Sequence, residues 1–350
     1  MKNIIIVAPI LSGQGGTETV IKKVLKRFDK KSQFNVKLLL LGEPKKKDWL
    51  KDIDEKQLII CESHNKILRI FWFVRFLLTE HINDLIIINT QLIHIAHLVK
   101  GIFKRDFLIY SWIHFSLDNS NTVNLTYLKE ADKHLAISSG IKKQLINLEI
   151  SPRNIELIYN PISTNLKKIK RSQDGVFRFL YMGRVEYNHQ KNVELLLRSL
   201  TTLEGNWLLV IIGDGDDVKK CKKLADELGI KDRIVWKGWK SFPWSTLDEI
   251  DALVLPSNYE GLPMVLLEAL SYGIPCVSTD CPTGPEDIIE DKYNGRLVKM
   301  NEPVDLSDKM RWIMKNLNEL KEETLKSSIN KFYDDNYFER LENIFSEMND

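Results

Sequence analysis

The sequence predicts an α/β protein built from two Rossmann-like, doubly wound domains whose parallel sheets face a cleft. Short apolar, β-branched runs alternate with amphipathic stretches of helix length along the chain, which is typical of parallel βα units. The alternation is interrupted by a polar, lysine-rich stretch at 160–175, which is typical of a linker, and then restarts. At 350 residues the chain is long enough for two such domains.

The first domain is expected at residues 1–165 and begins with the apolar run KNIIIVAPI at 2–10. This run stops at a glycine-rich loop, SGQGGTE at 12–18, and apolar residues then recur with a helical period over 17–28. Further strands of this domain are expected at Val36–Leu41, Leu58–Cys61, Leu85–Asn89, Phe107–Ile113, His134–Ile137 and Ile155–Ile158.

The second domain is expected at residues 166–325. Its strands are expected at Phe177–Met182, Trp207–Ile212, Arg233–Lys237, Ala252–Pro256, Pro275–Ser278 and Gly295–Val298. The segment 322–348 has a helical period, and we expect residues 326–350 to form a C-terminal helix that packs back toward the first domain.

The composition, 43% hydrophobic and 28% charged, is that of a soluble globular protein and excludes disordered and fibrous classes. The apolar runs are shorter than the roughly 20 residues that span a bilayer. The N-terminus reads as a buried strand, because it lacks the long apolar region and the cleavage site of a secretion signal. The four cysteines show no metal-ligand spacing, so we expect free thiols in a reducing cytoplasm.

Charge is distributed unevenly along the chain. Residues 1–172 carry 28 Lys and Arg against 16 Asp and Glu, a net charge of +12, whereas residues 173–350 carry a net charge of −10. This asymmetry indicates an anionic partner for the basic half, mutual attraction of the two domains, or both. The stretch NKILRIFWFVRFLL at 65–78 is either a buried helix or a basic, aromatic-rich helix in the membrane interface. The positive charge favours peripheral contact with the anionic inner face of the cytoplasmic membrane.

In open α/β sheets, ligands bind beyond the carboxyl ends of the strands. The predicted strand that ends at Pro256 is followed by EGLPMVLLEA at 260–269. If a helix begins near Leu262, the backbone N–H groups of residues 261–265 can bind a diphosphate. Glu260 then reaches hydroxyls on one side of the diphosphate, and Glu268 reaches the hydroxyls of a ribose on the other. The competing interpretation is a glutamate that complements the helix dipole and another on a solvated face.

This segment resembles the signature of glycosyltransferase family 4, in which two glutamates eight positions apart precede a Gly-x-Pro turn. Matching elements occur in the family's order over about four-fifths of the chain. They are GGTE at 15–18, WIHFS at 112–116, YMGRVEYNHQKN at 181–192, IIGDGDD at 211–217 and VWKGW at 235–239. STDCPTGPEDII at 278–289 resembles the branch of the lipopolysaccharide 1,6-galactosyltransferases. The resemblance implies the GT-B architecture.

The resemblance also implies site residues. Glu260, His114, Arg184 and Lys191 would be catalytic, with Arg184 and Lys191 neutralising charge on the departing diphosphate. Donor contacts are expected from Gly15, Gly16, Gly183, Gly213, Gly238, Gly261, Leu262, Pro263, Met264, Val265 and Glu268, and Glu18 is expected to face the acceptor. The competing interpretations are surface basicity for Arg184 and Lys191, a tight turn for Gly213–Gly215, and a structural histidine for His114.

The implied reaction is metal-independent, cofactor-free transfer of a hexose, galactose or glucose, from a UDP-sugar with retention at the anomeric carbon. The acceptor would be a glycan or a lipid-linked glycan in the synthesis of a cell-surface polysaccharide such as lipopolysaccharide or capsule. The alternatives are a nucleotide-sugar epimerase of the same architecture and a non-catalytic subunit that binds a sugar nucleotide. A dehydrogenase is disfavoured because GQGGTE lacks the Gly-x-Gly-x-x-Gly pattern. Nucleic-acid binding has no recognisable reading motif.

Overall fold

The computed structural model describes residues 1–13, 15–29, 33–118, 123–165 and 167–346. The chain forms two compact units. Unit 1 comprises Met1–Pro161 together with Phe338–Asp350, and unit 2 comprises Ile162–Tyr337. The predicted boundaries were 165/166 and 325/326.

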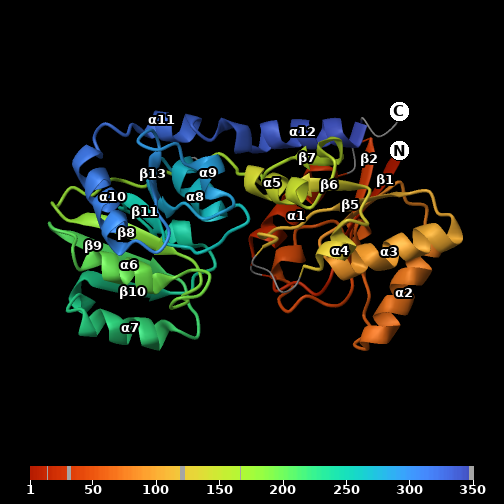
Figure 1. Ribbon diagram of the computed structural model, residues 1–350, viewed down its shortest axis with the longest axis horizontal. Coiled ribbons are helices and arrows are strands. Elements are labelled where there is room, and N and C mark those ends of the chain that lie inside the picture. Colours follow the sequence, from red (N-terminus) through yellow and green to blue (C-terminus); the bar gives the residue numbers. More distant parts are fainter. Residues whose placement is uncertain (14, 30–32, 119–122, 166, 347–350) are drawn as a thin grey trace. The chain divides into compact units, whose positions relative to one another are not determined.

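Among the described residues, unit 1 contains a seven-stranded parallel sheet in the order β3-β2-β1-β4-β5-β6-β7 (Figure 1). Its strands are β1 (Lys2–Ala8), β2 (Phe34–Leu40), β3 (Leu58–Ile60), β4 (Asp84–Ile87), β5 (Leu108–Ser111), β6 (Lys133–Ala136) and β7 (Ile155–Leu157). Its helices are α1 (Gly16–Arg27), α2 (Lys66–Thr79), α3 (Thr90–Phe103), α4 (Leu125–Leu128) and α5 (Ser139–Asn147), with 3₁₀ turns η1 (Asp48–Leu50), η2 (Glu55–Gln57) and η3 (Pro152–Asn154).

Unit 2 contains a six-stranded parallel sheet in the order β10-β9-β8-β11-β12-β13. Its strands are β8 (Phe177–Met182), β9 (Trp207–Ile212), β10 (Ile234–Gly238), β11 (Ala252–Leu255), β12 (Cys276–Thr279) and β13 (Gly295–Val298). Its helices are α6 (Val193–Leu200), α7 (Val218–Glu227), α8 (Met264–Ser271), α9 (Pro285–Ile288), α10 (Pro303–Asn316) and α11 (Glu322–Ser327), with 3₁₀ turns η4 (Lys231–Arg233), η5 (Pro243–Thr246) and η6 (Asn330–Phe332).

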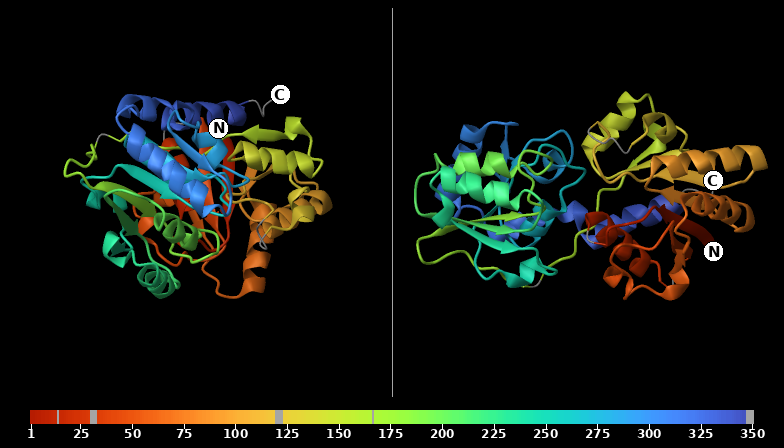
Figure 2. Two further views of the ribbon diagram at one scale, coloured as in Figure 1. Left: turned by 60° about the vertical axis from the view of Figure 1, so that its left-hand side comes forward. Right: turned by 90° about the horizontal axis from the view of Figure 1, so that it is seen from below.

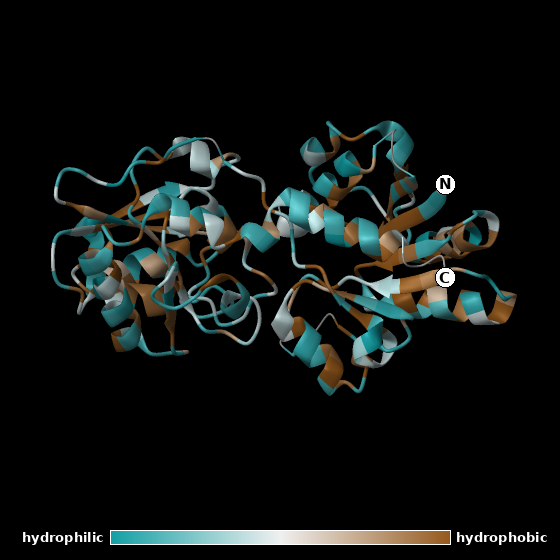
Figure 3. Ribbon diagram, turned by 90° about the horizontal axis from the view of Figure 1, so that it is seen from above, coloured by the Kyte–Doolittle hydropathy of each residue, from teal (hydrophilic) through white to brown (hydrophobic). Residues whose placement is uncertain are grey.

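The two sheets confirm the predicted fold class, and every predicted strand is present with ends that differ by no more than two residues. The strands read as nearly continuous apolar runs because helices cover both faces of each sheet (Figure 2). Strands of both units are drawn mostly in hydrophobic colours, whereas most helices alternate (Figure 3). In β1, for example, Ile4, Ile6 and Val7 are fully buried.

The lysine-rich stretch predicted as a linker is bound to unit 2. Lys170 donates its backbone N–H to Asp248 O and accepts from Ile250 N, at 2.9 and 3.0 Å. Asp251 accepts from the backbone N–H of Ser172 at 2.8 Å and from its hydroxyl at 2.7 Å. These bonds hold residues 170–172 in unit 2, which begins at Ile162, before the predicted boundary.

The C-terminal segment is divided rather than continuous. Helix α11 ends at Ser327, the 3₁₀ turn η6 follows, and helix α12 covers Asp334–Ser346. The interruption arises because Ile162 donates its backbone N–H to Phe332 O and accepts from Asp334 N. The second half of α12 belongs to unit 1, where the ring centroids of Phe345 and Phe28 are 5.6 Å apart. The last four predicted helical residues, 347–350, lie outside the described residues.

No helix within the described ranges is long and apolar enough to cross a membrane.

Candidate functional site

The sequence-predicted residues of unit 2 gather beyond the carboxyl ends of β8 and β11. These strands are neighbours, and the chain proceeds from them in opposite directions across the sheet, toward β10 on one side and β13 on the other. Such a reversal is the switch point at which open α/β sheets bind ligands. The loop after β8 carries Arg184 and Lys191, and the loop after β11 carries Glu260.

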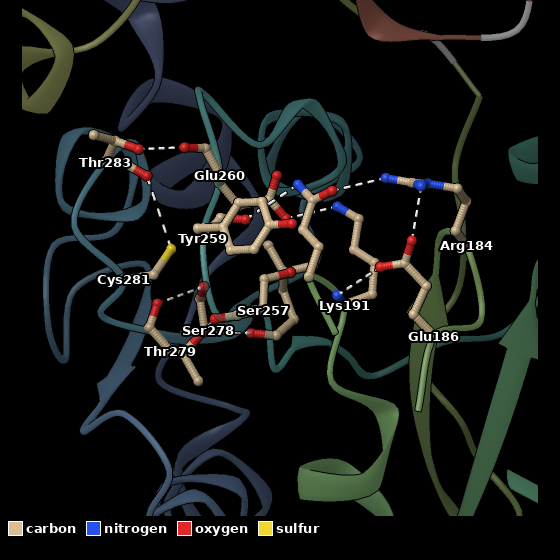
Figure 4. Close-up of polar contacts among 12 residues, drawn as sticks. Arg184, Glu186, Lys191, Ser257, Tyr259, Glu260, Ser278, Thr279, Cys281 and Thr283 are labelled. Carbon is tan, nitrogen blue, oxygen red and sulfur yellow. Dashed lines mark hydrogen bonds and ion pairs between the residues drawn. The ribbon is translucent and has the colours of Figure 1, made fainter. Parts of the chain in front are cut away.

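Lys191 and Glu260 form a direct ion pair. The Lys191 ammonium lies 2.6 Å from Glu260 Oε1, and the two side chains are only 16% and 8% exposed (Figure 4). A carboxylate with so little water around it needs a cation or several donors to remain charged. The pair thus brings a positive group from the β8 loop and a negative group from the β11 loop into direct contact.

Arg184 lies on the same loop but is paired differently. Its guanidinium contacts Glu186 Oε1 at 2.7 Å and donates to Gln190 Oε1 at 2.7 Å, and its side chain is 65% exposed. Glu186 also accepts from the backbone N–H of Lys191 at 3.1 Å. Arg184 is therefore held to its own loop while most of its side chain faces solvent.

Three residues that sequence reasoning did not single out fasten the β8 loop to the β11 loop. Asn258 donates its side-chain amide to His189 O at 2.7 Å and accepts from the Asn192 amide at 2.9 Å. Gln190 donates to Tyr259 O at 3.1 Å. His189, for which the sequence suggested no role, thus contributes its backbone carbonyl. These bonds set the distance across which Lys191 meets Glu260.

The glycines of the second-domain loops permit close backbone approach. A Cβ atom at Gly213 would lie 1.8 Å from Gly183 O, and one at Gly215 would lie 2.3 Å from Val185 O. The backbone N–H of Gly213 also donates to Gly238 O at 3.0 Å. Side chains at these two positions would push the β8 loop away, so the glycines have a packing role whether or not they contact a ligand.

Helix α8 begins at Met264, two residues later than expected, after the buried residues Gly261 and Leu262. Pro263 precedes the helix and has no backbone N–H, so the predicted set of donors at 261–265 loses one member. The first turn of α8 presents the N–H groups of Met264 and Val265 at the positive end of the helix dipole.

A further loop, between β12 and α9, supports the segment that carries Glu260. The Thr283 hydroxyl donates to Glu260 O. Gly284 has a φ of +96°, and a Cβ atom there would lie 2.6 Å from Pro263 Cδ and 2.8 Å from Gly261 O. The sequence signal for this contact was the segment CPTGP, in which a glycine between a threonine and a proline marks a tight turn.

Glu268 lies one turn into α8, and its carboxylate Oε2 accepts a hydrogen bond of 2.7 Å from the Trp244 indole. Trp244 belongs to η5, on the connection from β10 to β11. Sequence reasoning singled out Glu268 but not its tryptophan partner.

In unit 1, Gly15 and Gly16 lie where β1 leads into α1, and Gly16 is the first helical residue. Glu18, which the resemblance placed on the acceptor side, is 5% exposed, and its carboxylate is bonded within the loop. It accepts from the Ser12 hydroxyl at 2.7 Å and from the backbone N–H groups of Gly13 and Gly15 at 2.8 and 3.1 Å. Glu18 therefore shapes the glycine-rich loop at the helix N-terminus.

His114 follows β5 by three residues. Burial lowers the pKa of His114 to about 3, so the ring is neutral at physiological pH. Its ring packs at 4.5 Å from the Trp112 ring. Within the part of the chain that the structure describes, its Nε2 atom is buried without a hydrogen-bond partner, which is unusual for a polar atom in a native fold. A ligand hydroxyl that reached this atom would complete its hydrogen bonding.

All four cysteines are buried and unpaired, as expected for free thiols. Burial raises the pKa of the Cys281 thiol to about 12, with a further contribution from the Glu260 carboxylate, so this thiol beside the site is not a nucleophile. In the described ranges, His, Cys, Asp and Glu side chains do not gather in groups of three that could hold a metal ion.

The two Rossmann-like units are the GT-B architecture that the resemblance implies. The family model described as glycosyl transferases group 1 matches residues 163–330. The chain is 36% identical to the lipopolysaccharide 1,6-galactosyltransferase of Escherichia coli strain K12 over 95% of each chain. It is 36% identical to that of Salmonella typhimurium strain LT2 over 97% of each chain. This chain therefore belongs to the group 1 glycosyltransferases, and the resemblance inferred from its motifs is confirmed.

Solved structures agree with this assignment. The apo form of the lipopolysaccharide outer core galactosyltransferase WaaB superposes with a TM-score of 0.88 at 36% identity, over 99% of each chain. Anabaena Alr3699/HepE in complex with UDP superposes with a TM-score of 0.81 over 99% of this chain and 100% of that one. The latter is 14% identical and shows the common fold alone.

Proposed function

We propose that this chain transfers a galactosyl group from UDP-galactose to a lipopolysaccharide acceptor, with retention at the anomeric carbon and without a metal ion. The Lys191–Glu260 pair at the switch point of unit 2 is the observation that carries the proposal. The identity and acceptor class of relatives that align over 95% of this chain support the choice of sugar and acceptor.

The site residues divide the reaction between them. Glu268 binds the ribose hydroxyls, and the N-terminal turn of α8 binds the diphosphate. The bond between the anomeric carbon and the diphosphate oxygen breaks, and its electron pair leaves with UDP. Lys191 and Arg184 stabilise the charge that develops on that oxygen. Lys191 must then exchange part of its contact with Glu260 for the phosphate, which leaves the Glu260 carboxylate to hold hydroxyls of the hexose.

The acceptor hydroxyl attacks the same face of the anomeric carbon that the diphosphate leaves, and its proton passes to the departing phosphate oxygen. Glu260 stabilises the positive charge of the oxocarbenium-like state rather than acting as a covalent nucleophile. Retaining hydrolases use a second carboxylate about 5 Å from the first. Here Glu268 is engaged by Trp244 and is reserved for the ribose.

A panel of nucleotide sugars tests the proposal. The protein is incubated with UDP-galactose, UDP-glucose, UDP-N-acetylglucosamine or GDP-mannose in the presence of EDTA, with and without truncated lipopolysaccharide. We expect transfer from UDP-galactose alone and an α-anomeric product. Interconversion of the sugar nucleotide without acceptor would instead identify an epimerase, and binding of UDP without turnover on any acceptor would indicate a non-catalytic subunit.

Peripheral contact with an anionic membrane through α2 is part of the proposal. The outward residues Ile67, Leu68 and Phe71 are 76%, 56% and 69% exposed, whereas Phe73 and Leu77 are fully buried. Helix α2 therefore has a buried side, as the first interpretation of this stretch expects, and an exposed apolar side, which the membrane interpretation requires. The neighbouring α3, which packs beside α2 (Figures 1 and 2), adds exposed apolar residues near its C-terminal end: Leu98, Ile102 and Phe103.

Basic residues accompany this apolar surface, which favours an anionic lipid surface. Lys66, Arg69 and Arg75 lie on α2, and Lys104 and Arg105 follow α3. Complete burial of an Ile or Phe side chain is worth about 1.5–3 kcal/mol. We expect the double variant Ile67→Ser/Phe71→Ser to lose at least about ten-fold in affinity for vesicles that contain phosphatidylglycerol. Val304→Ser, which removes a 60%-exposed apolar side chain from α10, is the matched control. Equal sedimentation of all three proteins would refute the contact.

A further inference from the structure

Trp244 contacts the helix that carries the ribose-binding glutamate at two points. Its indole N–H donates to Glu268 Oε2 at 2.7 Å. Its ring stacks on Tyr272 with centroids 4.8 Å apart and planes 24° from parallel. Tyr272 is the C-cap of α8, one turn beyond Glu268. Trp244 itself is only 8% exposed. A planar ring that is fixed by one face and one edge has no freedom to rotate away from the carboxylate.

The backbone that carries Trp244 is itself held in place. The Lys167 ammonium donates to three carbonyls at the end of η5, those of Trp244, Ser245 and Leu247, at 3.1, 3.1 and 2.9 Å. Immediately after them, Asp248 and Ile250 bond to the backbone of Lys170. The cation satisfies carbonyls that a helix end leaves without partners, and it ties the segment to the chain that enters unit 2.

A glutamate side chain has three rotatable bonds, and fixing it costs conformational entropy. A partner that fixes the carboxylate before the ligand arrives removes that cost from binding. A hydrogen bond from an indole orients a carboxylate and brings no positive charge of its own, unlike the lysine that meets Glu260. Of the two glutamates of EGLPMVLLEA, Glu260 is paired with a lysine and Glu268 accepts a hydrogen bond from an indole.

We propose that Trp244 is a positioning residue that orients the Glu268 carboxylate toward the 2′ and 3′ hydroxyls of the donor ribose. The inference rests on the proposed function, in which Glu268 binds that ribose. Trp244 touches neither the sugar that moves nor the bond that breaks. Its effect therefore appears in the affinity for the nucleotide and not in the rate at saturating donor.

Calorimetric binding of UDP and of 2′,3′-dideoxy-UDP to the full chain separates this role from a structural one. Trp244→Phe keeps the aromatic stack on Tyr272 and removes the N–H donor. We expect five- to ten-fold weaker binding of UDP, unchanged binding of dideoxy-UDP, and a raised KM for the donor with unchanged kcat. In a Glu268→Gln background the same change should have little further effect.

Trp207→Phe is the matched control. It removes an indole hydrogen bond of 2.9 Å, to Leu203 O, at the start of β9 and away from the loops. It should leave the affinity for both nucleotides unchanged. If Trp244→Phe does not fold, Lys167→Met releases the η5 carbonyls instead and should weaken UDP binding while sparing dideoxy-UDP.

Equal weakening of both nucleotides by Trp244→Phe would show a merely structural role and overturn the inference, as would unchanged binding of UDP. A failure of the proposed function has a different signature. In that case the wild-type protein does not bind UDP, or binds UDP and dideoxy-UDP equally, or Glu268→Gln binds UDP like the wild type.

Discussion

Lys191→Met is expected to destabilise unit 2 because it leaves the Glu260 carboxylate, 8% exposed, without its cation. Removing one partner of a buried ion pair costs about 3–5 kcal/mol, and we take the lower end because Lys191 retains 16% exposure. Unit 2 spans Ile162–Tyr337, a size at which 1 kcal/mol shifts the melting temperature by about 2–4 °C. The expected fall in Tm is therefore about 6–12 °C.

The matched control is Lys231→Met. Lys231 and Asp226 are separated by 2.5 Å, a distance similar to that of the buried pair, but both side chains are 60% exposed. A surface pair of this kind contributes about 0–1 kcal/mol. Differential scanning calorimetry of both variants measures the difference, and Glu260→Gln with Lys191→Met/Glu260→Gln completes the double-mutant cycle. If Lys191→Met melts within 2 °C of Lys231→Met, the Glu260 carboxylate is not desolvated and the reasoning is refuted.

Further predictions concern catalysis, acid stability, loop packing and metal dependence. Glu260→Gln should lower kcat at least about 100-fold while UDP binding persists by calorimetry, and unchanged turnover would remove Glu260 from the catalytic residues. The pKa of His114 is about 3 in the fold and about 6.5 when unfolded, so only the unfolded state gains its proton between these values. The free energy of unfolding then falls as pH drops below about 6.5, by at most about 1.4 kcal/mol per pH unit. Urea unfolding at pH 7, 6 and 5 should show a smaller fall for His114→Gln than for the wild type. Gly213→Ala places a Cβ atom 1.8 Å from Gly183 O and should weaken UDP binding more than ten-fold, whereas Gly229→Ala, with a φ of +70° and open space around its Cβ position, should leave binding unchanged. EDTA should not reduce transfer from UDP-galactose, and complete dependence on added Mg²⁺ or Mn²⁺ would contradict the roles given to Lys191 and Arg184.

The strands were predictable because their signal is local. Trp207–Ile212 is an apolar run between Asn206 and Gly213, and its predicted ends agree with the structure to the residue, as do those of Phe177–Met182 and Gly295–Val298. The interruption of the C-terminal helical segment was not predictable in this way. It depends on backbone bonds between Ile162 and residues near 332–334, which are about half the chain away in sequence.

The same distinction applies to the site. Motifs indicated Lys191 and Glu260 separately, but only the fold brings together two residues that are 69 positions apart. Asn258 and Thr283 were missed because such residues are common in loops, and their partners here are backbone carbonyls and the Asn192 amide, which lie far from them in sequence. The bonding of Glu18 within its loop did have a signal in the sequence. A glutamate at the third position of a helix commonly reaches back to the residue before the helix, as Glu18 does to Gly15.

The close packing of loops around Gly213 and Gly284 limits how the sugar specificity of such a site can be altered by substitution. The loops after β8, β9, β11 and β12 are joined by contacts that leave no space for a Cβ atom at these two positions. A substitution in one of them transmits displacement to the others because packed backbone does not compress. Redesign of sugar specificity should therefore transplant these four segments as one cassette.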